Sequence, residues 1–545
     1  MKKYFIFLIL LVSTKLTSAQ NWQWAKHIGS DCGSYNEKIN SVISDGSNIY
    51  VIGKFYGCLY LPNDTLFSNG FDDIFISKFD GGGGEIWSKQ IGSSNTNITY
   101  HENANAVFDP VNNCIYLSGT FINTIDFGNG IILNSYSTSN VDNFIARMDL
   151  NGNFIWAKKC TGNGIKREPN IYVDSSGNIY LLTQTADSVY FDGFHVGPGG
   201  TIAKYDPNGI CYYAQNKFTA PVLGNTNAVF LNFIGSDIFL YGAFRSIPFQ
   251  IDTALLIPQG NYDAFIARAD SNGGIKWIKT FGNAGLDYIQ SLSIDNFNNI
   301  YIIGGFQDSI DFGNGNLYNT GKDIVIAKFD VNGNLIWNKQ LFVTGNLQSG
   351  NQILSDLDGN SYIAGLFSGF ASFGAFNLFT SNASDMFLAR YDQNGNCMGV
   401  RNFGEASCQS ISIDSNNNVI CGGFFKNTVN IGGNTFTSYL SNDLFLAKID
   451  AITGIGGRET NPNNQLIIYA NPNAGKCNIT VPDDFVNEKN LVLSIYDNTG
   501  KLIQQTTLEM NEGKIKVNLE AEAKGVYNVT LSSKKKSYNG KIVFE

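Results

Sequence analysis

One apolar run recurs along most of the chain and predicts its main strands. It reads Ile-Tyr-Val-Ile-Gly-Lys-Phe at residues 49–55 and Ile-Tyr-Ile-Ile-Gly-Gly-Phe at 300–306. Related runs begin at residues 115, 179, 238, 362 and 419. β-branched and aromatic residues favour strands, and these runs are apolar on both alternating faces. A strand in a sheet with one solvent-facing side is apolar on one face only. We therefore predict strands that are buried between neighbouring sheets.

A second pattern ends another predicted strand, for example residues 74–79. It consists of a small residue, a basic residue, any residue and an aspartate, and it occurs seven times with its aspartates 57 to 69 residues apart. Repeats of this length indicate a solenoid, a propeller or an array. The seven aspartates are Asp80, Asp149, Asp206, Asp270, Asp330, Asp392 and Asp450.

A turn and a return strand follow this motif. The clearest copies of the turn read Asp-x-Asn-Gly-Asn, at 149–153, 330–334 and 392–396, and Asn-Gly favours a hairpin because both residues tolerate positive φ. Tyr213 and Gly399 occupy the Trp position of the return strand in two divergent copies. With a more polar first strand, such as 39–44, each repeat contains four antiparallel strands. The return strands are marked by Trp87, Trp156, Trp277 and Trp337, each seven residues after the motif aspartate.

The two ends of the repeat array complement each other. Residues 24–29, which begin with Trp24, match 87–92 but have no strand before them. After Asp450, residues 451–454 contain no Trp strand. Joining these ends closes a ring and removes an exposed sheet edge. We therefore predict an all-β fold, a seven-bladed β-propeller with four-stranded blades over residues 20–453, and not an open solenoid.

The repeats also resemble a known family. The pattern Asp-x-Phe-Ile-Ala-Arg-x-Asp-x-Asn-Gly-x-x-x-Trp, alternating with Gly-Asn-Ile-Tyr strands, looks like the bacterial β-propeller repeats called SBBP over roughly residues 21–455. The resemblance implies the propeller fold. It implies no particular reaction, because that family is defined by its repeats.

The composition changes after Asp450. Residues 454–464 form a linker rich in Gly, Pro and Asn, and residues 465–545 follow with a different strand rhythm. This last part is similar to the type A C-terminal sorting domains of the Por, or type IX, secretion system, although Ala470 stands where that family usually has Pro. The matching motif residues are Asn471, Pro472, Gly475, Tyr496, Asp497, Gly500, Lys501, Gly525 and Tyr527.

This second resemblance implies a C-terminal Ig-like β-sandwich that directs export in a Bacteroidota-type bacterium and is cut off afterwards. Its partner is then the outer-membrane secretion machinery. The alternative is a plain Ig-like binding module.

The first residues predict a signal peptide over 1–19. Lys2 and Lys3 precede an apolar run at 4–12, and small residues lead to a cleavage site between Ala19 and Gln20. The run is shorter than the roughly 20 residues that span a bilayer, and no later segment is apolar for long enough. We expect a mature chain without a transmembrane segment, secreted or at the cell surface after passing the periplasm and outer membrane.

Composition narrows the partners further. The net charge of −9 gives no electrostatic attraction to nucleic acid, so no nucleic-acid partner is expected. The nine cysteines form no Cys-x-x-Cys pair, which argues against a metal cluster and a disulfide framework. We expect most of them to be buried packing residues.

Two rings of repeated charges are candidate sites. An aspartate stands seven positions before the motif aspartate in six repeats. It is either a cation ring at the channel mouth or a cap on nearby backbone amides. A ligand site normally breaks symmetry, so we expect caps. The basic motif residues are either an anion ring or, as we expect, partners of the aspartate two residues on or of a neighbouring blade. The six aspartates are Asp73, Asp142, Asp263, Asp323, Asp385 and Asp443.

No catalytic residue, metal site or cofactor site is predicted. His27, His101 and His195 lie at unrelated repeat positions, and the chain has no Gly-x-Ser-x-Gly, His-Glu-x-x-His or Walker motif. The turns lack the distal Glu of an EF-hand. We expect a non-enzymatic propeller that binds an extracellular glycan or protein. The alternatives are a carbohydrate-active enzyme with carboxylates at the channel mouth and a structural adhesion protein.

Overall fold

The computed structural model describes most of the chain. The described residues are 22–32, 37–70, 72–92, 103–137, 141–162, 169–185, 187–218, 228–234, 237–245, 249–345, 348–374, 376–450, 466–470, 473–482, 485, 491–497, 502–508, 513–533 and 537–544. Within them the regular structure consists of strands, without an α-helix. The fold is all-β, as the apolar pattern predicts.

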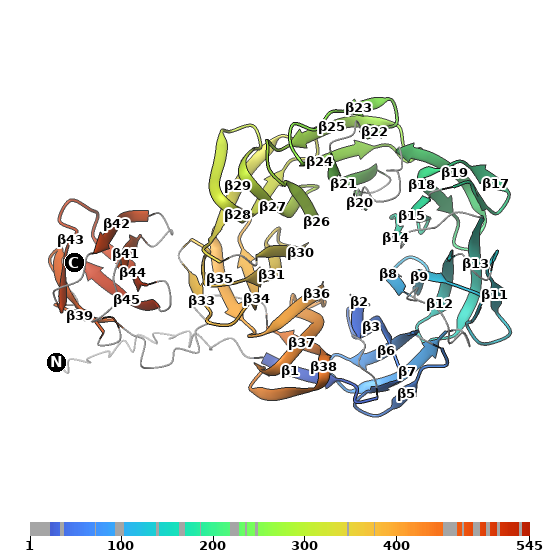
Figure 1. The fold of residues 1–545 in the computed structure, drawn as a ribbon, viewed down its shortest axis with the longest axis horizontal. Coiled ribbons are helices and arrows are strands. Elements are labelled where there is room, and N and C mark those ends of the chain that lie inside the picture. The colour runs from blue at the N-terminus through green and yellow to red at the C-terminus, as the bar shows by residue number, and fades with distance from the viewer. Residues whose placement is uncertain are drawn as a thin grey trace, which may run out of the picture.

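Seven of the described sheets share a core of four antiparallel strands. They stand side by side around a central axis, with the first strand of each sheet innermost (Figure 1). The chain runs through the first six of them in succession, so each sheet is one repeat of the sequence. The architecture is a β-propeller.

The first three sheets come from the N-terminal half of the array. Sheet one contains β2 (Lys38–Ser44), β3 (Asn48–Phe55), β6 (Asp73–Asp80) and β7 (Glu85–Ile91), with the hairpin β4 (Cys58–Tyr60) and β5 (Thr65–Phe67). Sheet two contains β8 (Asn103–Asp109), β9 (Cys114–Phe121), β12 (Asp142–Asp149) and β13 (Phe154–Gly162), with β10 (Thr124–Asp126) and β11 (Ile132–Asn134). Sheet three contains β14 (Asn170–Val173), β15 (Ile179–Thr185), β18 (Gly199–Tyr205) and β19 (Cys211–Phe218). The hairpin of its repeat, β16 (Val189–Phe191) and β17 (Phe194–Val196), is bonded to sheet two.

The remaining four sheets complete the ring. Sheet four contains β20 (Ala228–Ile234), β21 (Asp237–Arg245), β24 (Tyr262–Ala269) and β25 (Ile275–Phe281), and the hairpin of its repeat, β22 (Phe249–Ile251) and β23 (Ala254–Leu256), is bonded to sheet three. Sheet five contains β26 (Tyr288–Ile294), β27 (Ile300–Asp311), β28 (Asn316–Phe329) and β29 (Leu335–Val343). Sheet six contains β30 (Ser349–Ser355), β31 (Ser361–Phe367), β34 (Asp385–Tyr391) and β35 (Cys397–Asn402), and the hairpin of its repeat, β32 (Phe370–Ser372) and β33 (Asn377–Phe379), is bonded to sheet five. Sheet seven contains β36 (Ala406–Ile413), β37 (Val419–Ile431), β38 (Asn434–Ile449) and β1 (Trp22–Ile28).

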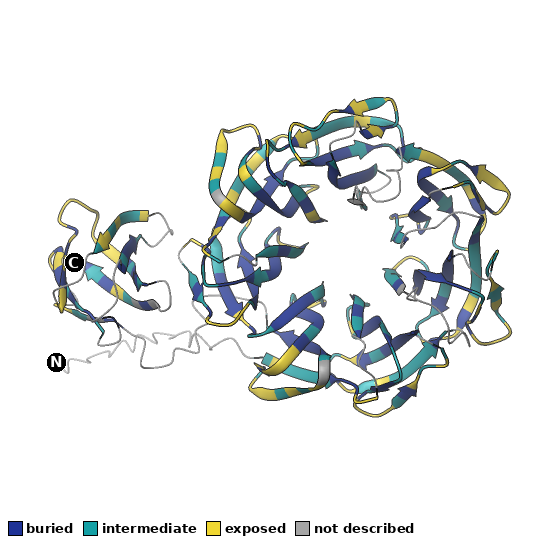
Figure 2. Ribbon diagram, in the orientation of Figure 1, coloured by how far each residue is buried: buried dark blue, intermediate teal, exposed yellow. Residues whose placement is uncertain are grey.

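The second and third strands of each sheet form the core. Every residue of β9 and of β34 is buried, and Figure 2 shows the buried positions concentrated on these middle strands. Side chains of adjacent sheets pack together. Tyr50 and Ile76 of sheet one, for example, share a cluster with Ile115 and Leu117 of sheet two. Burial on both faces is therefore the reason why these strands read as continuous apolar runs.

The outer hairpins reach across to the preceding sheet. The pair β16–β17 extends the sheet of β13, β22–β23 extends that of β19, and β32–β33 extends that of β29. Each such hairpin pairs with part of an outer strand that otherwise presents unpaired backbone groups to solvent. We call these hairpins the arms, together with β4–β5, β10–β11 and the outer ends of β27–β28 and β37–β38.

The N-terminal strand closes the ring. β1 pairs antiparallel with β38, with Trp24 opposite Lys448 and Ala25 opposite Ala447, so the segment around Trp24 completes the last sheet as predicted. Ile28 and Leu446 of this sheet then pack with Ile39 of sheet one. We call this interface between sheets seven and one the closing seam. It has the same kind of apolar core as the interfaces between other adjacent sheets.

A disulfide reinforces this seam. Cys32, just after β1, is bonded to Cys58 on β4, with their Cα atoms 5.5 Å apart. The expectation of no disulfide framework needs this correction, and the other seven cysteines are free. The spacing of the cysteines gave no sign of the pair because their contact depends on how the hairpin β4–β5 lies against the end of β1, where Gly29 bridges Tyr60.

The C-terminal module consists of two sheets around one core. One sheet contains β39 (Ile467–Tyr469), β40 (Lys476–Thr480) and β43 (Lys514–Asn518). The other contains β42 (Leu502–Leu508), β41 (Leu491–Tyr496), β44 (Gly525–Ser532) and β45 (Ser537–Phe544). Ile479 and Val517 of the first pack with Ile495 and Val529 of the second.

Deleting residues 20–30 tests ring closure. The deletion leaves the outer backbone groups of β38 unpaired, so we expect aggregation or a clearly lower melting temperature, measured by light scattering and calorimetry. The control is the double variant Cys32→Ser, Cys58→Ser, which keeps β1. A deletion variant that stays monomeric and melts like the parent would contradict closure by β1.

Candidate functional site

The motif aspartates cap the turns that follow them. Asp330 accepts hydrogen bonds at Oδ1 from the backbone N–H groups of Asn332 and Asn334, both at 2.8 Å, and at Oδ2 from the Asn334 side chain. A carboxylate used in this way fixes the turn and has little left for a cation. Asp80, Asp149, Asp206, Asp270 and Asp392 accept the same two backbone bonds. Asp450 instead accepts from Gln23 Nε2 at 2.7 Å.

The glycine of each turn lies against the preceding sheet. Gly395 has a φ of +78°, and a Cβ there would lie 2.8 Å from the Trp337 ring. Gly83, on the closing seam, has the same relation to Trp24 at 2.6 Å. Only a residue without a side chain permits both the positive φ and this contact. The Asn-Gly signal is thus a packing requirement between sheets as well as a turn signal.

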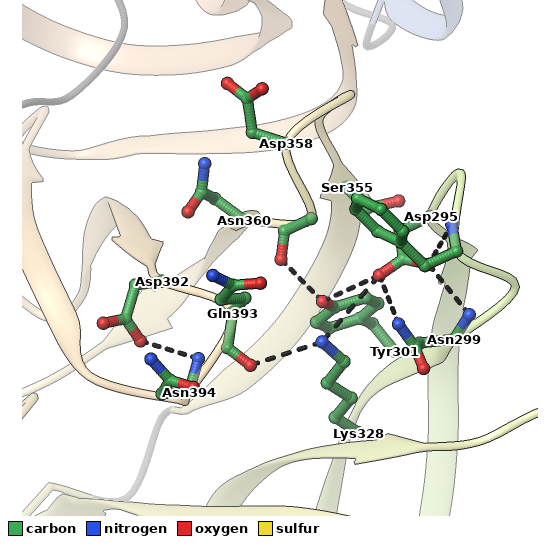
Figure 3. A network of polar contacts seen from close by, with 12 residues as sticks. Asp295, Asn299, Tyr301, Lys328, Ser355, Asp358, Asn360, Asp392, Gln393 and Asn394 are labelled. Atoms are coloured by element: carbon green, nitrogen blue, oxygen red, sulfur yellow. Dashed lines mark hydrogen bonds and ion pairs between the residues drawn. The ribbon is translucent and has the colours of Figure 1, made fainter.

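One backbone carbonyl in each turn joins the two sheets. The indole Nε1 of Trp337 donates to the carbonyl of Gln393 at 3.0 Å, and Lys328 Nζ donates to the same oxygen at 3.2 Å. Figure 3 shows the Lys328 bond. We call this pair of donors on one turn carbonyl the clasp. Trp24 and Lys448 bind Gly81 O, Arg147 and Trp156 bind Pro207 O, and Arg268 and Trp277 bind Val331 O in the same way.

Three copies lack the full clasp among the described residues. Tyr213, which replaces Trp in the third repeat, donates from its phenol to Ser271 O at 2.8 Å, without a second bond from Lys204. In the first repeat Lys78 binds Leu150 O, but the buried indole nitrogen of Trp87 has no hydrogen-bond partner. In sheet six Gly399 stands in place of the aromatic donor. Either donor of the clasp can therefore be absent.

A buried carboxylate of the same sheet pairs with the basic residue of the clasp. Lys328 Nζ lies 4.8 Å from the Tyr301 ring centre and 3.8 Å from Asp295 Oδ2, and burial lowers the pKa of Lys328 while Asp295 opposes this. The Tyr301 hydroxyl lies 3.1 Å from the same carboxylate oxygen and 2.6 Å from Gly359 O (Figure 3). Arg390 pairs with Asp356 and Lys448 with Asp414 in equivalent positions.

The expected partners of the basic residues need one correction. The carboxylate that pairs with them comes from the turn between the first and second strands of the same sheet, and not from the aspartate two residues on, which caps its own turn. The expected contact with a neighbouring sheet is present as the clasp. In the sheets where these ion pairs are described, the carboxylates neutralise the basic side chains. The basic residues of those sheets therefore offer no site for an anion.

Five of the six aspartates that precede the motif accept backbone amides, as expected, and Asp385 accepts side-chain amides instead. Asp73, Asp142, Asp263 and Asp443 each accept a backbone N–H from the end of their arm, at 2.7 to 3.0 Å. Asp323 accepts from Val343 N–H, and Asp385 from the side chains of Asn382 and Asn402. All six are buried. Burial raises the pKa of Asp73 to about 6.

Polar side chains of the inner strands are also occupied. Ser410 Oγ of sheet seven accepts the Val42 N–H of sheet one, and Ser41 Oγ accepts the Ala106 N–H of sheet two. Ser291 and Ser293 serve β30 in the same way. These hydroxyls join sheets near the axis as the clasps join them further out.

A group that does not repeat lies at the closing seam. His27 Nε2 is 2.6 Å from Asp443 Oδ2, and Glu37 is buried nearby with its pKa raised to about 7, mainly by burial and further by Asp443 and Asp72. Asp31, Cys32 and Cys58 lie within ligand distance of one another. The two sulfurs form the disulfide, so they are not thiolate ligands for a metal.

The described histidines have no catalytic partner. His27 contacts Asp443 and the rings of Phe425, Phe436 and Tyr439, and His195 contacts the Tyr190 ring. His101 lies outside the described residues. No nucleophilic serine or cysteine bonds to either described histidine, so the structure adds no catalytic constellation to the described part of the chain.

The sorting-motif residues that the structure describes lie at strand ends and in the core. Gly475 has a φ of +95° and donates its N–H to Asn473 Oδ1. Tyr496 ends β41, Asp497 follows it, Gly525 begins β44, and Tyr527 is buried in the module core. The predicted Ala19, Gln20, Asn471, Pro472, Gly500 and Lys501 lie outside the described residues.

Sequence comparison identifies the C-terminal module. Residues 467–545 match the family described as secretion system C-terminal sorting domain. This domain indicates export by the type IX system to the cell surface or the medium, and it implies an interaction with the secretion machinery. No helix among the described residues is long and apolar enough to cross a membrane. No curated protein sequence matches the chain.

Structural comparison returns a propeller and several other proteins, all at low similarity. The Dos1 propeller has 9% identity and a TM-score of 0.38, covering 80% of this chain and 96% of that chain. A DUF4221 member from Bacteroides vulgatus has 9% identity and a TM-score of 0.30, covering 79% and 98%. The GH43 protein BlXynB from Bacillus licheniformis has 10% identity and a TM-score of 0.29, covering 95% and 90%. Scores this low carry no argument, and the architecture rests on the sheet topology.

The clasp is tested by two matched substitutions. Trp337→Phe removes ring area and an indole hydrogen bond, whereas Trp87→Phe removes the same area where no bond exists. We expect Trp337→Phe to lower the free energy of unfolding by about 1 kcal/mol more than Trp87→Phe, measured in urea. Equal losses in the two variants would show that the indole bond contributes nothing.

The buried Glu37 predicts a pH dependence. Its folded pKa of about 7 lies above its ordinary value of 4.5, so the folded chain binds more protons there between these values and stability falls as pH rises through this range. Glu37→Gln stays neutral at every pH. We expect its melting temperature to exceed that of the parent increasingly from pH 5 to pH 8. A pH-independent difference would contradict the raised pKa, and Asp287→Asn, at a carboxyl with its pKa also raised to about 7, is an independent second case.

Proposed function

We propose that the protein is an exported, non-enzymatic, seven-bladed β-propeller of the SBBP repeat type that binds an extracellular glycan or protein. The observation that carries the export part is the match of residues 467–545 with the sorting-domain family. A signal peptide cleaved between Ala19 and Gln20 takes the chain across the inner membrane of a Bacteroidota bacterium. The Ig-like C-terminal sandwich then directs it across the outer membrane.

The structural contacts of the repeated charged side chains support a binding role over an enzymatic one. The motif aspartates cap turns and the paired basic residues hold clasps, so they are committed to structure. An enzyme of the carboxylate-pair type needs accessible acids. At the closing seam, Glu37, which has no counterpart in the other repeats, and the repeated Asp443 are only 4% and 1% exposed. Loops and arms on a rigid ring are a common place for binding residues.

The linker 454–464 is the natural place for processing after export. It is rich in Gly and Asn and separates the repeat array from the sorting module. Segments of this composition between domains are the usual sites of proteolysis. Cleavage there releases a complete repeat array.

Removing residues 465–545 tests the export part. We expect the truncated chain to fold its propeller and to remain in the periplasm, because the signal peptide is intact and the sorting module is absent. The measurement is fractionation of a host that carries the type IX system, with the full-length chain as control. Equal amounts of both proteins at the surface or in the medium would contradict a sorting role.

A further inference from the structure

Three aromatic rings from distant parts of the chain meet where the propeller closes. His27 lies on β1, Tyr60 on β4 and Tyr439 on the arm part of β38. The His27 and Tyr439 rings are stacked at 17° with centres 5.3 Å apart, and Tyr60 meets Tyr439 edge-on at 76° and 5.9 Å. The Tyr60 hydroxyl donates to the carboxylate of Asp31. We call these four side chains the seam platform.

Much of Tyr439 remains exposed. Its ring stacks on His27 and makes a T-shaped contact with Tyr60, yet the residue is 54% exposed. Asp31 is exposed as well. An exposed aromatic face beside an exposed carboxylate presents an apolar surface and a strong hydrogen-bond acceptor to the same ligand.

The platform is held rigidly before any ligand arrives. Asp443 accepts the Tyr439 N–H at 3.0 Å and also binds His27 at 2.6 Å. The backbones of Gly29 and Tyr60 bond to each other in both directions, and the disulfide of Cys32 fixes the residue after Asp31. Preorganisation of this kind lowers the entropy lost on binding.

The platform breaks the symmetry of the ring. Tyr318 is an exposed tyrosine on the corresponding arm of sheet five, and it is 68% exposed. Its hydroxyl accepts from Asn316, and no ring contact to it is found among the described residues. The aromatic group with a neighbouring carboxylate therefore arises at the closing seam, where the two ends of the array meet.

The local charge selects the ligand. Lys54 is already paired with Asp72 at 3.3 Å, and Asp443 is buried against His27, so the exposed charge of the platform is that of Asp31. A negative site repels uronic acids and sulfated sugars. A neutral sugar ring has an apolar C–H face that suits Tyr439 and hydroxyl groups that donate to Asp31.

We propose that the seam platform binds a neutral sugar unit of an extracellular polysaccharide, with Tyr439 stacked on the sugar face and Asp31 accepting its hydroxyl hydrogens. This inference rests on the proposed binding function and names its ligand class and its residues. The site lies on the outer arms and not at the channel mouth.

Calorimetric titration of the full chain tests the platform. The probes are cellohexaose, xylohexaose, laminarihexaose and mannohexaose, with oligogalacturonate as the anionic comparison. We expect at least one neutral probe to bind with a Kd between about 10 μM and 1 mM, equivalent to roughly −7 to −4 kcal/mol. Tyr439→Ala and Asp31→Asn should each weaken that affinity at least about tenfold, which corresponds to about 1.4 kcal/mol.

Two variants separate binding from folding. Tyr318→Ala removes a more exposed tyrosine from the corresponding arm and should leave the affinity unchanged. Tyr439→Phe keeps the stacking face and should bind within about threefold of the parent, since stacking and not the hydroxyl carries the contact.

The outcomes distinguish the inference from the proposed function. Binding of a neutral probe that survives Tyr439→Ala overturns the platform and leaves the binding function in place. Preference for oligogalacturonate overturns the platform's ligand class. Binding of none of the glycan probes at 10 mM overturns the platform, and the proposed function then rests on a protein ligand, which a binding assay with host surface proteins decides separately.

Discussion

The structure depends on one backbone carbonyl in each turn that follows the motif aspartate. That oxygen accepts from a basic side chain of the preceding sheet, from an indole or phenol, or, in most described copies, from both. A single acceptor thus fixes two side chains of one sheet against the turn of the next. Most of the repeated residues are explained by this contact: the aspartate shapes the turn, the glycine admits the ring, and the Trp and Lys or Arg bind the carbonyl.

This arrangement leaves little of the repeat free for chemistry. The carboxylates that pair with the basic residues, such as Asp295 and Asp356, are buried and bound in their turns. Function is therefore expected where the repeat is broken. The closing seam is such a place, since it combines the first strand of the array, the last arm, a disulfide and a group of aromatic rings.

Much of the fold follows from sequence, and the reasons are local. The apolar runs and Asn-Gly turns predict strands and hairpins, and the unpaired match of Trp24 predicts the closing strand, which pairs with β38. The spacing Asp-x-x-x-Asn before the apolar runs, as at Asp295 and Asn299, would also have indicated the second set of turn caps. The meeting of Tyr60 with Tyr439 has no local signal because it arises only when the ring closes.

Hydrogen exchange of the backbone amides of β1 tests the central claim most directly, namely that the closing seam is equivalent to the others. The account predicts that β1 amides bonded to β38 exchange as slowly as those of β7 bonded to β6, because each is the outer strand of a four-stranded sheet and packs against the next sheet. Exchange of the β1 amides at the rate of an exposed loop, with β7 still protected, would contradict it.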